Sequence, residues 1–372
     1  MKMSRRAGHS PLGLVVSVLA LLVSGRLAAQ DDGTTWIDAG MLAVEGRPFT
    51  ERASTWDRLP AEAQGVVRPA VWNLSRDSAG IAVRFTTDSP SIAVRWTLTD
   101  PELAMPHMPA TGVSGVDLYG RTNDGWRWAA CGRPTGIENE RTLVKGLEPI
   151  EREWMLYLPL YNGVASIEIG VARGSDIAAA AVRDRPIVFY GTSITHGACA
   201  SRPGANHVAI LGRRLDRPVV NLGFSGNGRL EPEVGRFLVE IDASAFVLDC
   251  LPNLDGRRTA ARTEPMVRQI REAHPKTPII LVEDRTYADA RFSPGRAARN
   301  AENRRAFRTA YEKLLADGVT GLHYVDGDGL LGDDGEGTVD GSHPTDLGFE
   351  RQADALEPVL REALETPKGG RR

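Results

Sequence analysis

The chain has 372 residues, of which 42% are hydrophobic and 25% are charged, and its formal net charge is −3. This composition is ordinary for a globular protein and provides enough apolar material for two cores. We expect no nucleic-acid partner, because binding to a phosphate backbone requires clustered Lys and Arg.

Residues 1–29 are predicted to be a signal peptide. Basic residues precede an apolar run at residues 12–23, and Leu27-Ala28-Ala29 is a small-residue cleavage site. The run is too short to span a bilayer comfortably, and an uncleaved anchor is the alternative. We therefore expect an exported protein, periplasmic or secreted, with no stable membrane partner after the signal is removed.

Residues 31–182 are expected to form an all-β sandwich of jelly-roll type. Apolar and polar residues alternate at residues 81–87, 92–98 and 165–171, with turn residues between such segments. This alternation is typical of antiparallel strands. A second sheet is then needed, because an antiparallel sheet must bury its apolar face against another layer.

Residues 183–366 are predicted to form a second domain of α/β type. Short apolar runs occur at residues 186–191, 218–223, 245–250, 278–284 and 322–327. Amphipathic stretches separate them at residues 208–215, 232–241, 259–274 and 297–316, and a last helix starts near Thr345. Such alternation predicts a five-stranded parallel sheet covered by helices on both faces. Pro358 predicts a kink or break in the last helix. Residues 367–372 are expected to form a flexible tail.

Reactive side chains follow the predicted parallel strands, at the rim where open α/β sheets bind ligands. Ser193 follows the first strand, and Asp340 and His343 follow the fifth. A serine hydroxyl becomes a good nucleophile when an imidazole takes its proton, and a carboxylate fixes the tautomer of that imidazole. Taken alone, Ser193 is typical of a turn or a helix cap. Residues 340–343, taken alone, are typical of a solvated loop before a helix. Together they predict a catalytic triad.

An acyl-transfer site also needs an oxyanion hole, which stabilises the negative charge of the tetrahedral intermediate. The candidates are the backbone N–H groups of Ser193 and Gly226 and the side-chain amide of Asn253. Glycine lets the backbone approach a ligand closely, although Gly and Asn are more common in turns and caps.

These residues resemble the SGNH or GDSL hydrolase superfamily, whose four motif blocks carry Ser, Gly, Asn and His in that order. The four blocks correspond to residues 191–193, residues 221–226, Asn253 and residues 340–343. The resemblance implies a flavodoxin-like three-layer α/β/α fold with strand order 2-1-3-4-5, and a serine esterase mechanism without a metal or organic cofactor. Two departures are Thr192, where the family usually has Asp, and Asn253, which lacks the common preceding Gly and following Asp.

The segment Gly115-Val116-Asp117-Leu118-Tyr119 resembles the signature of a small β-domain that precedes the esterase domain in one branch of these hydrolases. Exported members of that branch look like carbohydrate esterases. The resemblance therefore implies a small-molecule or polysaccharide acyl ester as substrate, with release of acetyl or another short acyl group. Trp126 and Trp128 could line a sugar-binding face, but alternating aromatic residues in a strand are more often sandwich core.

Two other functions fit the same residues. An acyltransferase would pass the acyl group to a second alcohol instead of water, and a non-catalytic carbohydrate-binding protein would have kept only the fold. An α/β-hydrolase or a nucleoside triphosphatase is set aside, because the chain has neither a G-x-S-x-G elbow nor a P-loop.

Further residues near the rim are expected to bind substrate or support the site; they are Thr192, His196, Arg202, Asp284 and Arg285. The simpler alternatives are a partly exposed loop residue for His196 and a bracing ion pair for Asp284 and Arg285. Cysteine spacing does not suggest a zinc site. Cys199 and Cys250 follow neighbouring strands of the implied sheet, where export would permit a disulfide.

Overall fold

The structure is a computed structural model that describes residues 33–365. The predicted signal peptide at residues 1–29 and the predicted tail at residues 367–372 lie outside the described residues. Residues 34–365 belong to one compact unit. Within the described part, no helix is both long enough and apolar enough to cross a membrane.

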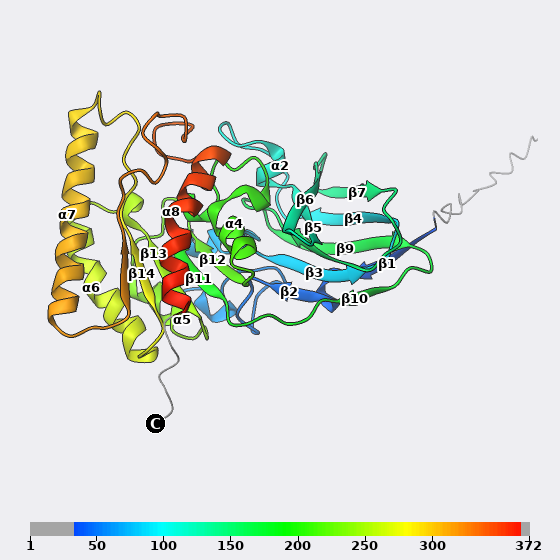
Figure 1. Cartoon of the computed structure of the whole chain (residues 1–372), viewed down its shortest axis with the longest axis horizontal. Coiled ribbons are helices and arrows are strands. Elements are labelled where there is room, and N and C mark those ends of the chain that lie inside the picture. Colours follow the sequence, from blue (N-terminus) through cyan, green and yellow to red (C-terminus); the bar gives the residue numbers. More distant parts are fainter. Residues whose placement is uncertain (1–32, 366–372) are drawn as a thin grey trace, which may run out of the picture. The chain divides into compact units, whose positions relative to one another are not determined.

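Two antiparallel sheets make up the first half of the described chain (Figure 1). The four-stranded sheet has the order β1-β9-β4-β7 and consists of β1 (Thr34–Asp38), β4 (Ser91–Leu98), β7 (Glu138–Lys145) and β9 (Val164–Ala172). The six-stranded sheet has the order β10-β3-β8-β5-β6, with β2 paired to β3. Its strands are β2 (Ala43–Glu45), β3 (Ala82–Thr87), β5 (Val116–Thr122), β6 (Gly125–Gly132), β8 (Arg152–Tyr157) and β10 (Ile177–Ala179).

The two sheets share one core, which confirms the predicted sandwich. Strand β4 buries every second residue, including Val94 and Trp96, and these pack with Phe85 and Leu118 of the other sheet. The alternation does not predict the short helical segments of this half, which are η1 (Ala39–Met41), η2 (Ala61–Ala63), α1 (Pro69–Leu74) and α2 (Ala110–Val113).

A five-stranded parallel sheet forms the second half, and its order β12-β11-β13-β14-β15 confirms the implied order 2-1-3-4-5. The strands are β11 (Ile187–Gly191), β12 (Val219–Gly223), β13 (Ala245–Asp249), β14 (Ile279–Val282) and β15 (Leu322–Val325). The helices are α3 (Ser193–His196), α4 (His207–Arg214), α5 (Pro232–Leu238), α6 (Gly256–Ala273), α7 (Pro294–Ala316) and α8 (Asp346–Glu365). Two 3-10 turns, η3 (Pro203–Ala205) and η4 (Leu251–Asn253), complete this half.

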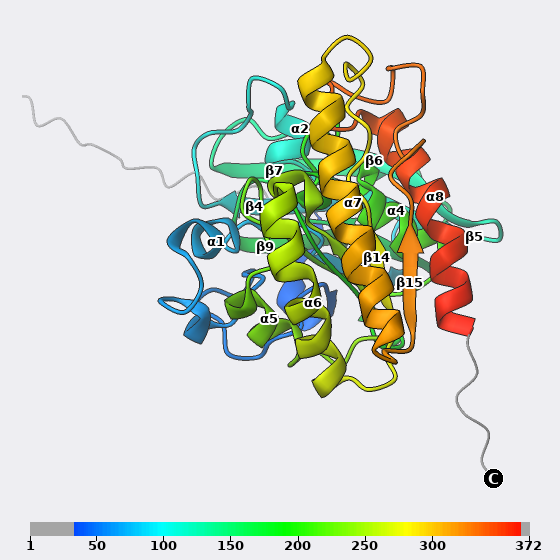
Figure 2. The same cartoon turned by 90° about the vertical axis from the view of Figure 1, so that its left-hand side faces the viewer.

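Helices cover both faces of this sheet, which makes three layers (Figures 1 and 2). Val188 and Tyr190 pack in the same core as residues of α5, α6 and α7, whereas Ile187 and Phe189 pack with α4 and α8. Because successive strand residues point to opposite faces, an unbroken apolar run is what a strand buried on both sides requires.

Helix α8 continues past Pro358, so the predicted break at this residue is wrong. Proline removes the hydrogen bond to the carbonyl four residues earlier, at Asp354. Both residues are exposed, so the carbonyl lies on the side of the helix where water can replace the missing donor.

The two halves share buried contacts. Tyr119 and Tyr157 of the six-stranded sheet pack against Ala209 of α4, and Trp72 of α1 joins the core beneath α5 and α6. The division into domains at residues 31–182 and 183–366 stays a prediction.

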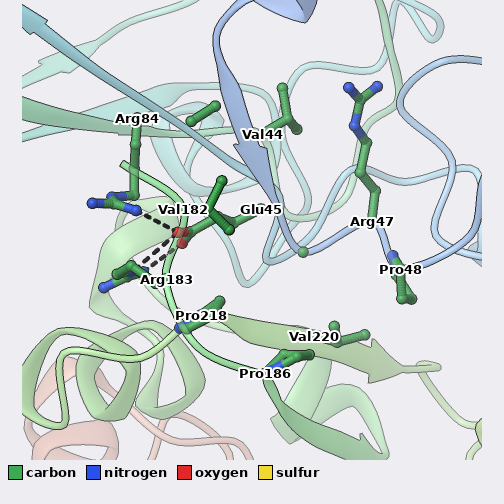
Figure 3. Close-up of a pocket in the computed structure, with 12 residues that line it drawn as sticks. Val44, Glu45, Arg47, Pro48, Arg84, Val182, Arg183, Pro186, Pro218 and Val220 are labelled. Atoms are coloured by element: carbon green, nitrogen blue, oxygen red, sulfur yellow. Dashed lines mark hydrogen bonds and ion pairs between the residues drawn. The ribbon is translucent and has the colours of Figure 1, made fainter. Parts of the chain in front are cut away.

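A cavity of about 280 Å³ lies between the halves, at the amino ends of β11 and β12 (Figure 3). Glu45 lies there between Arg84 and Arg183, and its Oε1 accepts hydrogen bonds from both, at 2.8 and 2.9 Å. Since Ser193 follows the carboxyl end of β11, this cavity is at the opposite edge of the sheet.

Candidate active site

Ser193 is the first residue of helix α3, two residues after the end of β11. Thr192 caps this helix, because its Oγ1 accepts a hydrogen bond from the N–H of Ile194 at 3.3 Å. A threonine hydroxyl thus performs the capping that an aspartate could perform at the same place. Ser193 is 7% exposed, so it lies just at the surface of the sheet rim.

Ser193, His343 and Asp340 form a continuous chain of hydrogen bonds. Ser193 Oγ lies 2.8 Å from His343 Nε2, and His343 Nδ1 lies 2.7 Å from Asp340 Oδ2. Burial acts to raise the pKa of Asp340, but hydrogen bonds from the backbone and ring of His343 outweigh it, so the pKa lies below its ordinary value. An ionised Asp340 holds the proton on Nδ1 and leaves Nε2 free to accept one from Ser193.

Arg285 braces the loop that carries His343. Its Nε donates to the carbonyl of Ser342 at 3.3 Å, and its Nη2 donates to the Ser342 hydroxyl. Arg285 also pairs with Asp284, a completely buried carboxylate that accepts a further hydrogen bond from Asn300 at 3.2 Å. The structure therefore places Asp284 and Arg285 as a support for the loop.

The three candidate oxyanion donors follow adjacent strands. Gly226 lies after β12 with a φ of +68°, so it adopts a left-handed conformation that glycine accommodates best. Asn253 ends the turn after β13; with its amide oriented to satisfy its neighbours, Oδ1 accepts from the N–H groups of Asn227 (3.1 Å) and Gly228 (3.3 Å). This orientation leaves the Nδ2 group of Asn253 as a donor beside the Gly226 loop.

Comparison with known proteins places the chain in a family. Residues 184–361 match the GDSL-like lipase/acylhydrolase family, and residues 34–177 match the N-terminus of the SGNH-hydrolase-type esterases, named GxDLY. A protein from Bacteroides ovatus ATCC 8483 described as a GDSL-like lipase is 36% identical, with a TM-score of 0.85, over 89% of this chain and 98% of that chain. The chain belongs to the GDSL-like lipase/acylhydrolase family.

Two more distant structures share the fold of this GDSL hydrolase. The salicylyl-acyltransferase SsfX3 from a tetracycline biosynthetic pathway is 21% identical, with a TM-score of 0.72, over 90% of this chain and 99% of that chain. A family two carbohydrate esterase from Cellvibrio japonicus is 13% identical, with a TM-score of 0.59, over 89% of this chain and 98% of that chain. A search of curated proteins found no match.

His196 is completely buried in the GDSL hydrolase, so it cannot touch a substrate, and it is not a partly exposed loop residue either. Its Nε2 lies 3.3 Å from Arg58 Nη2 and 3.4 Å from Asp77 Oδ2. Its ring stacks on Tyr161 with the centroids 4.0 Å apart. Because Arg58, Asp77 and Tyr161 come from the β half, His196 connects helix α3 to that half.

Arg202 connects the hydrolase half to the GxDLY segment. Its Nη1 donates to Asp117 Oδ2 at 2.7 Å and also bonds the hydroxyl of Tyr119. Asp117 is completely buried and accepts further hydrogen bonds from the N–H of Gly204 at 2.9 Å and from Trp128 Nε1 at 2.8 Å. The polar residues of this motif thus bind the loop that follows α3.

The two tryptophans of β6 have different environments. Trp126 is buried where the six-stranded sheet meets α4, which is not the sandwich core, whereas Trp128 is 52% exposed. Cys131, Cys199 and Cys250 are free, so the disulfide that export would permit between Cys199 and Cys250 is absent from the structure. Residues 33–365 contain no group of three or more His, Cys, Asp or Glu side chains arranged to hold a metal ion.

Sequence patterns did not point to three residues of the β half that lie near the site. The hydroxyl of Tyr161 donates to the carbonyl of Ser193 at 3.3 Å, and the ring of His107 lies 6.1 Å from that of His343, centroid to centroid. Arg58, which is completely buried, donates to the carbonyls of Asn221 (3.0 Å) and Gly223 (2.8 Å). Tyr161 begins a Tyr-Asn-Gly turn signal, and nothing in its local sequence indicates a distant contact.

Proposed function

We propose that this protein is an exported serine esterase that hydrolyses short-chain acyl esters, in particular acetyl esters of carbohydrates. The observation that carries the proposal is the hydrogen-bond chain from Ser193 Oγ through His343 to Asp340, in a member of the GDSL-like lipase/acylhydrolase family. The carbohydrate part takes its support from the fold shared with a family two carbohydrate esterase and from the GxDLY half.

In the proposed mechanism, His343 Nε2 takes the proton of Ser193 as Oγ attacks the ester carbonyl. The carbonyl oxygen becomes an oxyanion, which accepts hydrogen bonds from the N–H groups of Ser193 and Gly226 and from the Asn253 amide. The intermediate collapses when the protonated His343 gives its proton to the departing alcohol. A water molecule, deprotonated by His343, then attacks the acyl-enzyme, and the carboxylic acid leaves as Ser193 regains its proton.

The replacement Ser193→Ala tests the proposal. It should lower kcat for 4-nitrophenyl acetate by a factor of about 10³ or more, because the acyl-enzyme cannot form. Ser244→Ala is the matched control, since Ser244 bonds the carbonyl of Pro186 at the opposite edge of the sheet and should keep full activity. Undiminished hydrolysis by the Ser193 variant would rule out the serine esterase.

Acyl transfer to a second alcohol is the alternative use of the same acyl-enzyme, and the fold shared with a salicylyl-acyltransferase is its specific support. Products formed with a polyol acceptor present distinguish the two: free acetate indicates hydrolysis, and an acetylated polyol indicates transfer. A protein that binds carbohydrate but hydrolyses no ester would be the non-catalytic alternative.

Export is tested separately. When the full chain is produced in a bacterial host with an export pathway, the mature protein should begin near Gln30, after the proposed cleavage site. N-terminal sequencing of the exported protein would measure this, and a chain retained with residues 1–29 intact would contradict it.

A further inference from the structure

A loop of the β half brings a second histidine to the proposed active site. The rings of His107 and His343 are tilted by 44°, with their centroids 6.1 Å apart. His107 is exposed, and its ring makes no hydrogen bond with any other residue in the range 33–365. Its nitrogens are therefore available to a ligand placed beside His343.

The tip of this loop has a defined conformation. Met105 and Met108 each donate a backbone hydrogen bond to the carbonyl of the other, at 3.0 Å, so Pro106 and His107 form the tip of a tight turn. Met108 is 2% exposed and packs in the same core as Ile194 of helix α3. The exposed side chain of His107 therefore lies next to the buried side chain of Met108, which holds the loop against the core.

Helix α2, which follows the loop, is fixed to the segment after α3. Thr111 Oγ1 donates to the carbonyl of Ser201 at 2.6 Å, and a Cβ at Gly112 would lie only 2.2 Å from the carbonyl oxygen of Ala200. Ser201 in turn donates its N–H to Asp346 at 2.9 Å, at the start of α8 and three residues after His343. These contacts connect the loop that carries His107 to the start of α8, just after His343.

We propose that His107 binds a hydroxyl group of the alcohol portion of the substrate, next to the ester, and so selects esters of polyols such as sugars. This proposal rests on the proposed esterase function. In that mechanism His343 returns a proton to the departing alcohol, so the alcohol must lie against His343. A hydroxyl between the two rings can bond His107 directly, since an imidazole nitrogen donates or accepts at about 2.8 Å.

The expected consequence is discrimination by a single hydroxyl. A site built to bond a substrate hydroxyl discriminates against the analogue that lacks it, because the polar group of the site then stays unpaired. Ethyl acetate and 2-hydroxyethyl acetate form a matched pair, as they differ only in the hydroxyl next to the ester alcohol.

The test compares kcat/KM for these two esters in the full chain and in variants. The wild type should prefer 2-hydroxyethyl acetate, and His107→Ala should reduce the ratio of the two kcat/KM values about tenfold. His107→Gln, which keeps a hydrogen-bonding amide, should restore part of the ratio. His323→Gln, on the edge strand β15, is the control and should leave the ratio unchanged.

An unchanged ratio in His107→Ala would overturn the proposal while the esterase stands. If kcat/KM for both esters also fell by the same factor, His107 would be acting on His343 or on folding instead. Hydrolysis of neither ester by the wild type would instead contradict the proposed function, and this proposal with it.

Discussion

At the residue scale, Asp340 performs two tasks with its two oxygens. Oδ1 accepts the backbone N–H groups of Ser342 at 3.0 Å and His343 at 2.8 Å, which shapes the turn, and Oδ2 accepts the proton of the His343 ring. The carboxylate thus fixes both the position and the tautomer of the imidazole. The Asp340 side chain is 45% exposed, so water screens its charge, and we expect the orientation of His343 to be its larger contribution.

Replacement of Asp340 by Asn should lower kcat by a factor of about 10² to 10⁴, because an amide nitrogen facing Nδ1 favours the wrong tautomer. Initial rates with 4-nitrophenyl acetate measure the effect, and Asp354→Asn on the exposed side of α8 is the control. If the Asp340 variant kept full activity while His343→Ala lost it, a Ser-His dyad would replace the triad.

At the element scale, helix α3 is short, so its stability depends on the residues that cap its two ends and on the strand that it packs against. Thr192 caps its start, and Gly197 ends it with a φ of +115°. The helix lies directly on β12, since a Cβ at Gly223 would be 2.1 Å from the backbone nitrogen of His196. A helix of one turn has little stability of its own, so the cap and this contact together hold Ser193 in place.

Thr192→Val keeps the shape of the side chain but removes the capping hydroxyl, and it should destabilise the fold by about 1 kcal/mol. Urea unfolding measures this. Thr192→Ser retains the hydroxyl and should be more stable than the valine variant. Equal stability of the two would mean that the hydrogen bond to Ile194 contributes nothing.

The elements that sequence could predict are those with local patterns. Strands β11 to β14 are short, mostly apolar runs buried on both faces, and the edge strand β15 is buried only at its two ends. Ser193 comes two residues after β11, and Asp340 and His343 lie in the loop between β15 and α8. Helix α2 has four residues, too few for a helical period to be visible. Contacts such as that of Arg58 with Asn221 join positions 163 residues apart, and no local pattern encodes them.

At the scale of the whole molecule, the β half closes the open edge of the hydrolase sheet. Strand β12 is an edge strand, and the carbonyls of Asn221 and Gly223 accept hydrogen bonds from the guanidinium of Arg58 instead of from another strand. An unpaired edge buried without donors would be costly. The two halves therefore support each other's stability.

Arg58→Met should destabilise the protein by about 2 to 4 kcal/mol, since it leaves buried carbonyls without donors. Circular dichroism and tyrosine and tryptophan fluorescence would follow unfolding in urea. Arg95→Met, at a half-exposed ion pair with Glu140, is the control and should cost less than about 1 kcal/mol. If both variants lost only a similar small part of the free energy of unfolding, the hydrogen bonds from Arg58 to the edge of β12 would not contribute to stability as described.

The stability of the whole chain should also depend on Asp249, at the end of β13. Burial, together with the charge of Asp284, raises the pKa of Asp249 to about 7. The folded state then keeps a proton that the unfolded state loses above about pH 4, so stability falls as pH rises towards 7, by up to about 1.4 kcal/mol per pH unit. Asp249→Asn should remove this fall, which urea unfolding at pH 5 and pH 8 would measure. An identical pH dependence in the variant and the wild type would show that Asp249 does not titrate in this way.

The central claim is that Ser193 is a nucleophile activated by His343. The most direct measurement is reaction of the protein with an organophosphate ester, followed by mass spectrometry of its peptides. A single phosphoryl adduct should form on Ser193, and it should form much more slowly in His343→Ala. An unmodified protein, or an adduct on another residue in both proteins, would contradict the account.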